Sequence, residues 1–183
     1  MLAEPDSPSE RTRSVKKTRP IIACLLISFL AAQALAEVNI SADCRIKNRP
    51  PGRCGWCALE TLARHQQVTA LYGVTEKNAR RARPEDLEHV LTEADVDYRI
   101  QRRGTFGTRI LREAVRQDRG AVVGFRERSP GAGGHIVTLV DFGAEEVRVI
   151  DPNDADGRVR TMSRERFMHW WDGFALVLNP DAN

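Results

Sequence analysis

Two cysteines, Cys54 and Cys57, lie where a loop runs into a predicted helix. The loop, residues 48–52, reads Asn-Arg-Pro-Pro-Gly and contains too many breakers to form helix or strand. The residues after it favour a helix from about 54 to 67. A cysteine on the first turn of a helix meets unpaired backbone N–H groups and the positive end of the helix dipole, which stabilise its thiolate. Such a cysteine is a potential nucleophile.

A histidine and an aspartate at the ends of two predicted strands supply the base that this nucleophile requires. His135 opens the apolar run 135–142, and Asp151 closes the run 147–151. A hairpin with an odd loop centred on Gly143 would pair His135 directly with Asp151, with Cβ atoms about 5 Å apart. The carboxylate would then hold one imidazole nitrogen while the other faces outward. Cysteine, histidine and carboxylate are the nucleophile, base and orienting group of acyl-transfer chemistry.

The spacing of apolar residues changes halfway along the chain and predicts an α+β fold. A single strand, 98–101, is expected in a first half that is otherwise mainly helical. The further helices are predicted at 75–79, 84–91, 108–119 and 163–170. The strands of the second half are predicted at 121–125, 135–142, 147–151 and 174–178. A helical N-terminal half packed on a C-terminal antiparallel sheet is an α+β arrangement, in which the sheet carries the histidine and the aspartate.

The N-terminus carries the pattern of a secretory signal peptide. Basic residues between 11 and 19 precede an apolar run from 21 to 32 and an Ala-Leu-Ala site that ends at Ala36. Counted from residue 21 through this site, the apolar stretch is about 16 residues long, which is shorter than the roughly 20 that span a bilayer. We therefore expect cleavage after Ala36, export to a periplasmic or extracellular location, and no stable membrane association of the remaining domain, residues 37–183.

The expected mature domain is nearly neutral. Residues 1–36 hold 5 of the 28 basic and 3 of the 25 acidic residues, which leaves 23 against 22. This balance argues against nucleic acid as a partner. Three cysteines remain, Cys44, Cys54 and Cys57. An odd number in an oxidising compartment predicts one free thiol beside a disulfide that involves Cys44.

The order and spacing of these motifs resemble the papain-like cysteine peptidases, and most closely their branch of bacteriocin-processing, double-glycine leader peptidases. The resemblance covers roughly residues 46–178. It implies a papain-like α+β fold and a peptidase that acts on polypeptides without a metal or an organic cofactor. The matching motifs are Cys54-Gly55-Trp56-Cys57-Ala58-Leu59, His135-Ile136-Val137-Thr138-Leu139-Val140, Asp151-Pro152, and the late set Phe167, Trp171, Gly173, Leu176 and Leu178.

The resemblance implies that Cys54 is the nucleophile, His135 the base and Asp151 the orienting group. The family places a glutamine six residues before the nucleophile to donate to the oxyanion, and Asn48 holds that position here. Cys57 is the alternative nucleophile, because papain itself reads Cys-Gly-Ser-Cys-Trp and uses the second cysteine. The residue six positions before Cys57 is a proline, which has no side-chain donor. This difference favours Cys54.

Three other functions are compatible with the same residues. The Cys54-x-x-Cys57 spacing also occurs in thiol–disulfide oxidoreductases, where a strand leads into the motif. A zinc site could use Cys44, Cys54, Cys57 and His65, although their spacing matches no common zinc-binding pattern. A non-catalytic papain-like domain would bind peptides without cutting them. Asn153, beside the Asp-Pro pair, is assigned no role.

Overall fold

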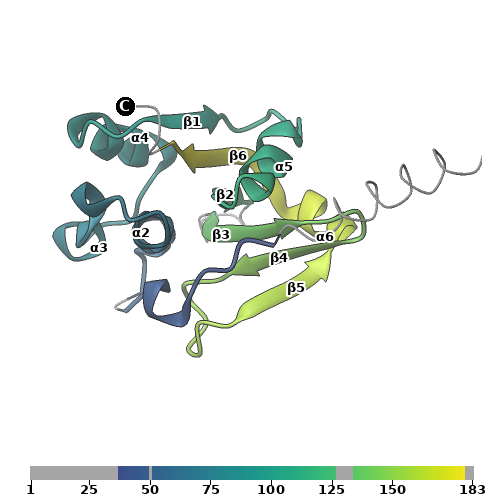
Figure 1. Cartoon of the computed structure of the whole chain (residues 1–183), viewed down its shortest axis with the longest axis horizontal. Coiled ribbons are helices and arrows are strands. Elements are labelled where there is room, and N and C mark those ends of the chain that lie inside the picture. Colours follow the sequence, from purple (N-terminus) through teal and green to yellow (C-terminus); the bar gives the residue numbers. More distant parts are fainter. Residues whose placement is uncertain (1–36, 50, 127–133, 180–183) are drawn as a thin grey trace, which may run out of the picture. The chain divides into compact units, whose positions relative to one another are not determined.

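A computed structural model describes residues 37–49, 51–126 and 134–179, so the signal peptide expected at 1–36 lies outside the described residues. Helices dominate the first half of the described chain and strands the second (Figure 1), which confirms the predicted α+β class. The helical elements are η1 (Ala42–Cys44), α2 (Cys54–His65), η2 (Thr69–Leu71), α3 (Val74–Lys77), α4 (Pro84–Glu93), α5 (Arg109–Arg116) and α6 (Arg164–Trp170). Within the described ranges, no helix has both the length and the apolar character needed to cross a bilayer.

Six strands form one antiparallel sheet in the order β1-β6-β2-β3-β4-β5. The strands are β1 (Tyr98–Gln101), β2 (Ala121–Phe125), β3 (His135–Phe142), β4 (Glu146–Ile150), β5 (Val159–Ser163) and β6 (Trp171–Leu178). Strand β5 is not among the strands predicted from the sequence. It lies at the edge of the sheet and none of its residues is buried, so it lacks the apolar pattern that marks a buried strand.

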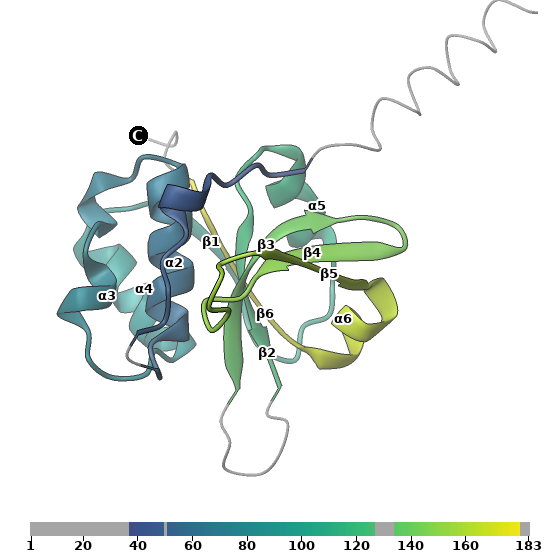
Figure 2. The same cartoon turned by 90° about the horizontal axis from the view of Figure 1, so that it is seen from below.

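Helix α2 packs on strand β3, and Figure 2 shows α2, α3 and α4 grouped on one side of the sheet. Ten consecutive residues of α2, from Cys54 to Ala63, are buried. Gly55 permits the closest approach, because a Cβ atom there would lie 2.7 Å from Cβ of Ala82 and 3.1 Å from Cδ1 of Ile136. The glycine after the first cysteine therefore allows the first turn of α2 to lie against the start of β3.

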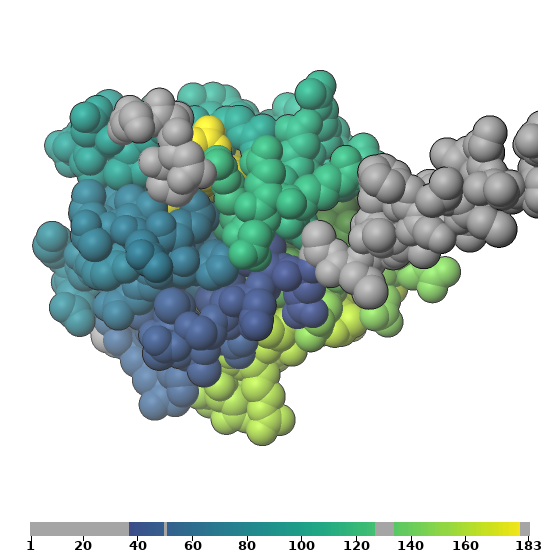
Figure 3. Space-filling model, in the orientation of Figure 1, coloured from purple at the N-terminus to yellow at the C-terminus, as the bar shows by residue number. Residues whose placement is uncertain are grey.

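The segment that leads into α2 lies alongside the strands (dark blue in Figures 1 and 3). Apolar Val38 and Ile40 in this segment are buried, and polar Asn39 between them is exposed, so apolar and polar residues alternate as in a strand. The backbone N–H of Val38 donates to the carbonyl of Val140 in β3 at 2.9 Å. This bond fastens the chain to the sheet shortly before the site loop.

The β3–β4 hairpin has a different register from the predicted one. Its turn is the two-residue pair Ala144 and Glu145, closed by a 2.9 Å hydrogen bond from the N–H of Gly143 to the carbonyl of Glu146. The predicted odd loop centred on Gly143 is therefore wrong. A bulge at Val140 in β3 then shifts the register by one residue, because Asp141 pairs with Arg148 and Leu139 pairs with Val149. The direct cross-strand pairing predicted for the histidine and the aspartate does not form.

Asp151 reaches His135 from outside the ladder. Ile150 is the last paired residue of β4, and Pro152 cannot extend the strand because it has no N–H to donate. Oδ1 of Asp151 instead accepts the backbone N–H of Asn153 at 2.9 Å, which makes an Asx turn. This turn holds the carboxylate of Asp151 next to His135. The two side chains are therefore neighbours, as predicted, but through the turn after β4 and not through cross-strand pairing.

A buried carboxylate in α2 holds the chain that follows the helix. Glu60 is 2% exposed, and its two oxygens accept the backbone N–H groups of Gly73 at 3.1 Å and Thr75 at 3.0 Å. It also pairs with Arg64 at 2.8 Å. Burial raises the pKa of Glu60, but the bonds from Thr75, Arg64 and Gly73 outweigh burial and leave the pKa below its ordinary value. Ionised Glu60 is therefore the form that the fold stabilises.

The first prediction concerns the pH dependence of this contribution. Because the folded-state pKa of Glu60 is lowered, its stabilisation is present above the ordinary pKa and is lost as the pH falls through the folded pKa. We expect Glu60→Gln to lower the free energy of unfolding by about 2 kcal/mol at about pH 7 and by much less at about pH 3, measured by urea unfolding. Exposed Glu76 gives the matched control, Glu76→Gln. An equal loss at both pH values would contradict the role of the charge.

Candidate active site

Cys54, the first residue of α2, lines a cleft together with His135 and Asp151. The cysteine is 6% exposed. Burial raises the pKa of the Cys54 thiol, but the hydrogen bond and the positive charge of His135 oppose this effect. The backbone N–H of Ile136 and the charge of Arg81 act in the same direction, and the net pKa lies below the ordinary value. The environment therefore favours the thiolate.

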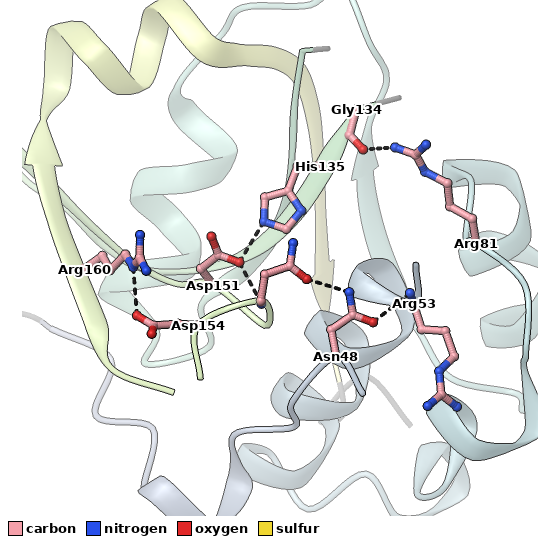
Figure 4. A network of polar contacts seen from close by, with 9 residues as sticks. Asn48, Arg53, Arg81, Gly134, His135, Asp151, Asp154 and Arg160 are labelled. Atoms are coloured by element: carbon pink, nitrogen blue, oxygen red, sulfur yellow. Dashed lines mark hydrogen bonds and ion pairs between the residues drawn. The ribbon is translucent and has the colours of Figure 1, made fainter. Parts of the chain in front are cut away.

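His135, the first residue of β3, lies between the thiol and a carboxylate. Its Nε2 is 2.8 Å from Oδ1 of Asp151 (Figure 4), which leaves Nδ1 for Cys54. Burial alone would lower the pKa of His135, but the bonds to Asp151 and Cys54 raise the pKa to about 9. Burial likewise raises the pKa of Asp151, and the bond and charge of His135 outweigh it and lower the pKa. The three side chains lie in a row, and the shifts of their pKa values favour the thiolate, the imidazolium and the carboxylate.

The second cysteine of the motif has the opposite environment. Cys57 is 0% exposed and is not among the residues that line the cleft. Burial raises the pKa of its thiol to about 11, against smaller effects of a hydrogen bond from Thr75 and the charge of Arg53. A neutral, enclosed thiol is a poor nucleophile. Of the two candidate nucleophiles, Cys54 alone has a histidine partner among the described residues.

The redox and zinc interpretations lose their structural basis. Cys44, Cys54 and Cys57 are all free thiols, so the expected disulfide from Cys44 is not formed. The oxidoreductase motif would require a strand that leads into α2, but no described residue before α2 belongs to a strand. Nε2 of His65 is 2.9 Å from the carbonyl oxygen of Asp118, not from a sulfur. Among residues 37–49, 51–126 and 134–179, no group of three or more His, Cys, Asp or Glu side chains is placed to hold a metal ion.

Asn48, the predicted oxyanion donor, lies in the cleft wall with Cys54. The residue is 8% exposed. Its Oδ1 accepts the backbone N–H of Arg53 at 2.8 Å, and its Nδ2 donates to Oδ1 of Asn153 at 2.6 Å (Figure 4). Its backbone N–H donates to the carbonyl of Pro152 at 2.9 Å. One hydrogen of the Asn48 side-chain amide is therefore bonded to Asn153, and the second is the one that could donate a hydrogen bond to an oxyanion.

Asn153, to which the sequence pattern assigns no role, connects two parts of the site. It receives the amide hydrogen of Asn48 on its side chain and gives its own backbone N–H to Asp151. It thereby connects the loop before the cysteine to the carboxylate that orients the histidine. The Asp-Pro-Asn sequence is typical of an Asx turn. That turn signal could have identified the backbone contact, but the bond to Asn48 joins loops far apart in the sequence.

The cleft beside these residues has a volume of about 750 Å³. One part of its lining is aromatic or apolar, with Phe125 at the end of β2, Met162 in β5 and Trp170 at the end of α6. The other lining residues are mostly polar or charged. They are Asn48, Pro51, Gly52, Cys54, Arg81, Arg126, Gly134, His135, Asp151, Asn153, Arg160 and Arg166. An extended chain could reach the sulfur of Cys54 through this opening.

Two solved structures are similar to this domain. The peptidase domain of Streptococcus ComA, a bifunctional ABC transporter involved in quorum sensing, matches with a TM-score of 0.57 at 17% identity, over 74% of this chain and 97% of that chain. A double-glycine-motif protease from an AMS/PCAT transporter, solved with its leader peptide, matches with a TM-score of 0.55 at 11% identity, over 79% and 94%. No family model and no curated protein matches the sequence. The predicted papain-like peptidase fold is therefore confirmed.

The second prediction tests the paired thiolate and imidazolium directly. We expect iodoacetamide to alkylate Cys54 at a lower pH than an ordinary cysteine, because the thiol pKa is lowered and the His135 pKa is raised to about 9. His135→Ala should slow this labelling at least about tenfold at the same pH. Mass spectrometry after a pH series locates the label. Labelling of Cys57 with the same histidine dependence would assign the nucleophile to Cys57 instead.

Proposed function

We propose that this chain is an exported papain-like cysteine peptidase that hydrolyses peptide bonds, or other amide bonds, through a thioester intermediate. The supporting observation is the row formed by Cys54, His135 and Asp151 at the edge of an open cleft, with 2.8 Å between the histidine and the aspartate. The shared fold of two peptidase domains supports the reaction class, and the signal-peptide pattern of residues 1–36 supports export.

The proposed reaction begins when the Cys54 thiolate attacks the carbonyl carbon of the substrate. The oxyanion that forms would accept hydrogen bonds from the backbone N–H of Cys54 and the free amide hydrogen of Asn48. His135 then gives its Nδ1 proton to the leaving amine, and the C–N bond breaks to leave a thioester. A water molecule loses a proton to His135 and attacks the thioester, which releases the acid and restores the thiolate. Asp151 holds the imidazole in position throughout.

A polypeptide is the substrate class that the cleft supports best. The cleft is open and combines apolar and charged walls, as an extended chain with varied side chains would require. One structure with a similar fold contains a leader peptide. A peptide that contains a Gly-Gly pair is therefore the first substrate to assay.

The third prediction separates catalysis from simple binding. We expect the wild-type domain to cleave peptides, Cys54→Ala to lose cleavage and retain peptide binding, and Cys57→Ala to cleave at a rate close to wild type. Chromatography of the products and fluorescence anisotropy of a labelled peptide measure the two properties. Binding without cleavage by the wild type would support the non-catalytic papain-like alternative. Cleavage by Cys54→Ala would contradict the proposed nucleophile.

The fourth prediction concerns the charge of Asp151. Asp151→Asn keeps an oxygen that can accept from Nε2 of His135 but removes the negative charge that raises the histidine pKa. The protonated imidazole is then lost at lower pH, so we expect the alkaline limb of the kcat/KM profile to move down from about pH 9. Asp151→Ala should lose about 10²-fold or more, since it also removes the orienting acceptor. An unchanged alkaline limb in Asp151→Asn would contradict this electrostatic role.

The fifth prediction distinguishes the oxyanion donor from the residue that positions it. Asn48→Ala should lower kcat by about 10²-fold, as the loss of an oxyanion donor does elsewhere. Asn153→Ala should lower kcat by about tenfold, because the Asn48 amide loses the acceptor that orients it. Neither change should alter iodoacetamide labelling of Cys54, since alkylation forms no oxyanion. Slower labelling in either variant would indicate a general disturbance of the site.

A further inference from the structure

Among the described residues that line the cleft, positive and negative charges are strongly unequal in number. Four arginines line it, Arg81, Arg126, Arg160 and Arg166, and the only carboxylate in its described lining is Asp151. That carboxylate already accepts from His135 and from the backbone of Asn153. Over residues 37–183 as a whole, the 23 basic and 22 acidic residues nearly cancel. The excess of positive charge is therefore a local property of the described lining of the cleft.

Two of the four arginines have partners within the fold. Arg160 pairs with Asp154 at 2.8 Å, and Arg81 donates to the carbonyl of Gly134 (Figure 4). These bonds partly satisfy both guanidinium groups. They also place one cation on each side of the triad, where Arg81 contributes to the lowered pKa of Cys54.

The other two arginines, Arg126 and Arg166, have no carboxylate partner among the described residues. Arg126 follows β2, and its guanidinium lies over the ring of Phe106, 5.4 Å from the centroid. Arg166 lies in α6 and is exposed. Its neighbour Arg164 donates to the carbonyl of Gly143 at 3.2 Å, so that arginine supports the fold. No such contact from the Arg166 side chain to a described residue is found.

These unpaired cations border the aromatic part of the cleft. Trp170 lines it from the end of α6, and the backbone N–H of Arg126 donates to the carbonyl of Trp170 at 2.8 Å. Phe125 precedes Arg126 and also lines the cleft. We call the surface formed by Phe125, Arg126, Arg166 and Trp170 the cationic wall. A guanidinium binds a carboxylate with two parallel hydrogen bonds, and aromatic side chains bind apolar ones.

We propose that the cationic wall selects polypeptide substrates that carry glutamate or aspartate close to apolar residues near the scissile bond. This inference rests on the proposed peptidase function and names its substrate class. The substrate carboxylates would pair with Arg126 and Arg166, while neighbouring apolar side chains would contact Phe125 and Trp170. Because the pairs are solvent-exposed, the selection weakens as salt concentration rises.

Binding to an inactive variant tests the wall without relying on catalysis. The probes are a labelled peptide of alternating glutamate and leucine ahead of a Gly-Gly pair and its copy with glutamine in place of every glutamate. In Cys54→Ala we expect the glutamate peptide to bind at least about tenfold more tightly, by fluorescence anisotropy at low salt. Adding Arg126→Gln and Arg166→Gln together should bring the affinity ratio close to one. Adding Arg112→Gln, which removes an exposed arginine of α5 outside the cleft lining, should leave the ratio unchanged.

Equal affinity for the two peptides in Cys54→Ala would overturn the inference, as would a ratio that survives the double arginine change in a folded protein. Circular dichroism checks the fold of each variant. Cleavage assays of the wild type keep the two proposals apart. Cleavage of both peptides with the same kcat/KM would reject the acidic preference and retain the peptidase. A binding ratio without cleavage of either peptide would retain the acidic preference and reject the peptidase.

Discussion

The chemistry of this domain depends on the close contact between the first turn of α2 and the start of β3. Gly55 makes the contact possible, because a larger residue would overlap the Cβ of Ala82. The contact places a cysteine that begins a helix beside a histidine that begins a strand. Helix position by itself favours a thiolate only modestly, and the imidazole supplies both the stabilising charge and the proton that the proposed amide cleavage needs.

Loops from both halves of the chain are joined around this contact by polar side chains. Asn48 belongs to the loop before α2, whereas Asp151 and Asn153 belong to the turn after β4. The Asn48 amide donates to the side chain of Asn153, and the backbone N–H of Asn153 donates to Asp151. The proposed oxyanion donor, Asn48, and the acceptor of the histidine bond, Asp151, therefore belong to one network. Because paired polar groups in a partly buried network restrain each other, the site is held without a disulfide or a metal ion among the described residues.

The two cysteines of α2 show how strongly surroundings determine reactivity. Cys54 and Cys57 lie one turn apart, yet the pKa is lowered in the first thiol and raised to about 11 in the second. The difference arises because the first thiol contacts His135 at the cleft, while the second is fully enclosed. The same cleft concentrates positive charge beside an aromatic wall. One small region therefore combines the candidate nucleophile with the surface for which we propose substrate selection.

The sequence by itself determined the fold class, the helix that carries the candidate nucleophile, the strand that begins at His135 and the strand that ends just before Asp151, because capping residues, breakers and apolar spacing act locally. It did not determine the hairpin register: the bulge at Val140 depends on how β3 packs between two neighbours. Edge strand β5 and the role of Asn153 also required tertiary structure, since exposed strands lack an apolar pattern and the bond to Asn48 joins distant loops. The choice between the two thiols depends on burial and on an imidazole from another element, and only the folded chain creates those surroundings.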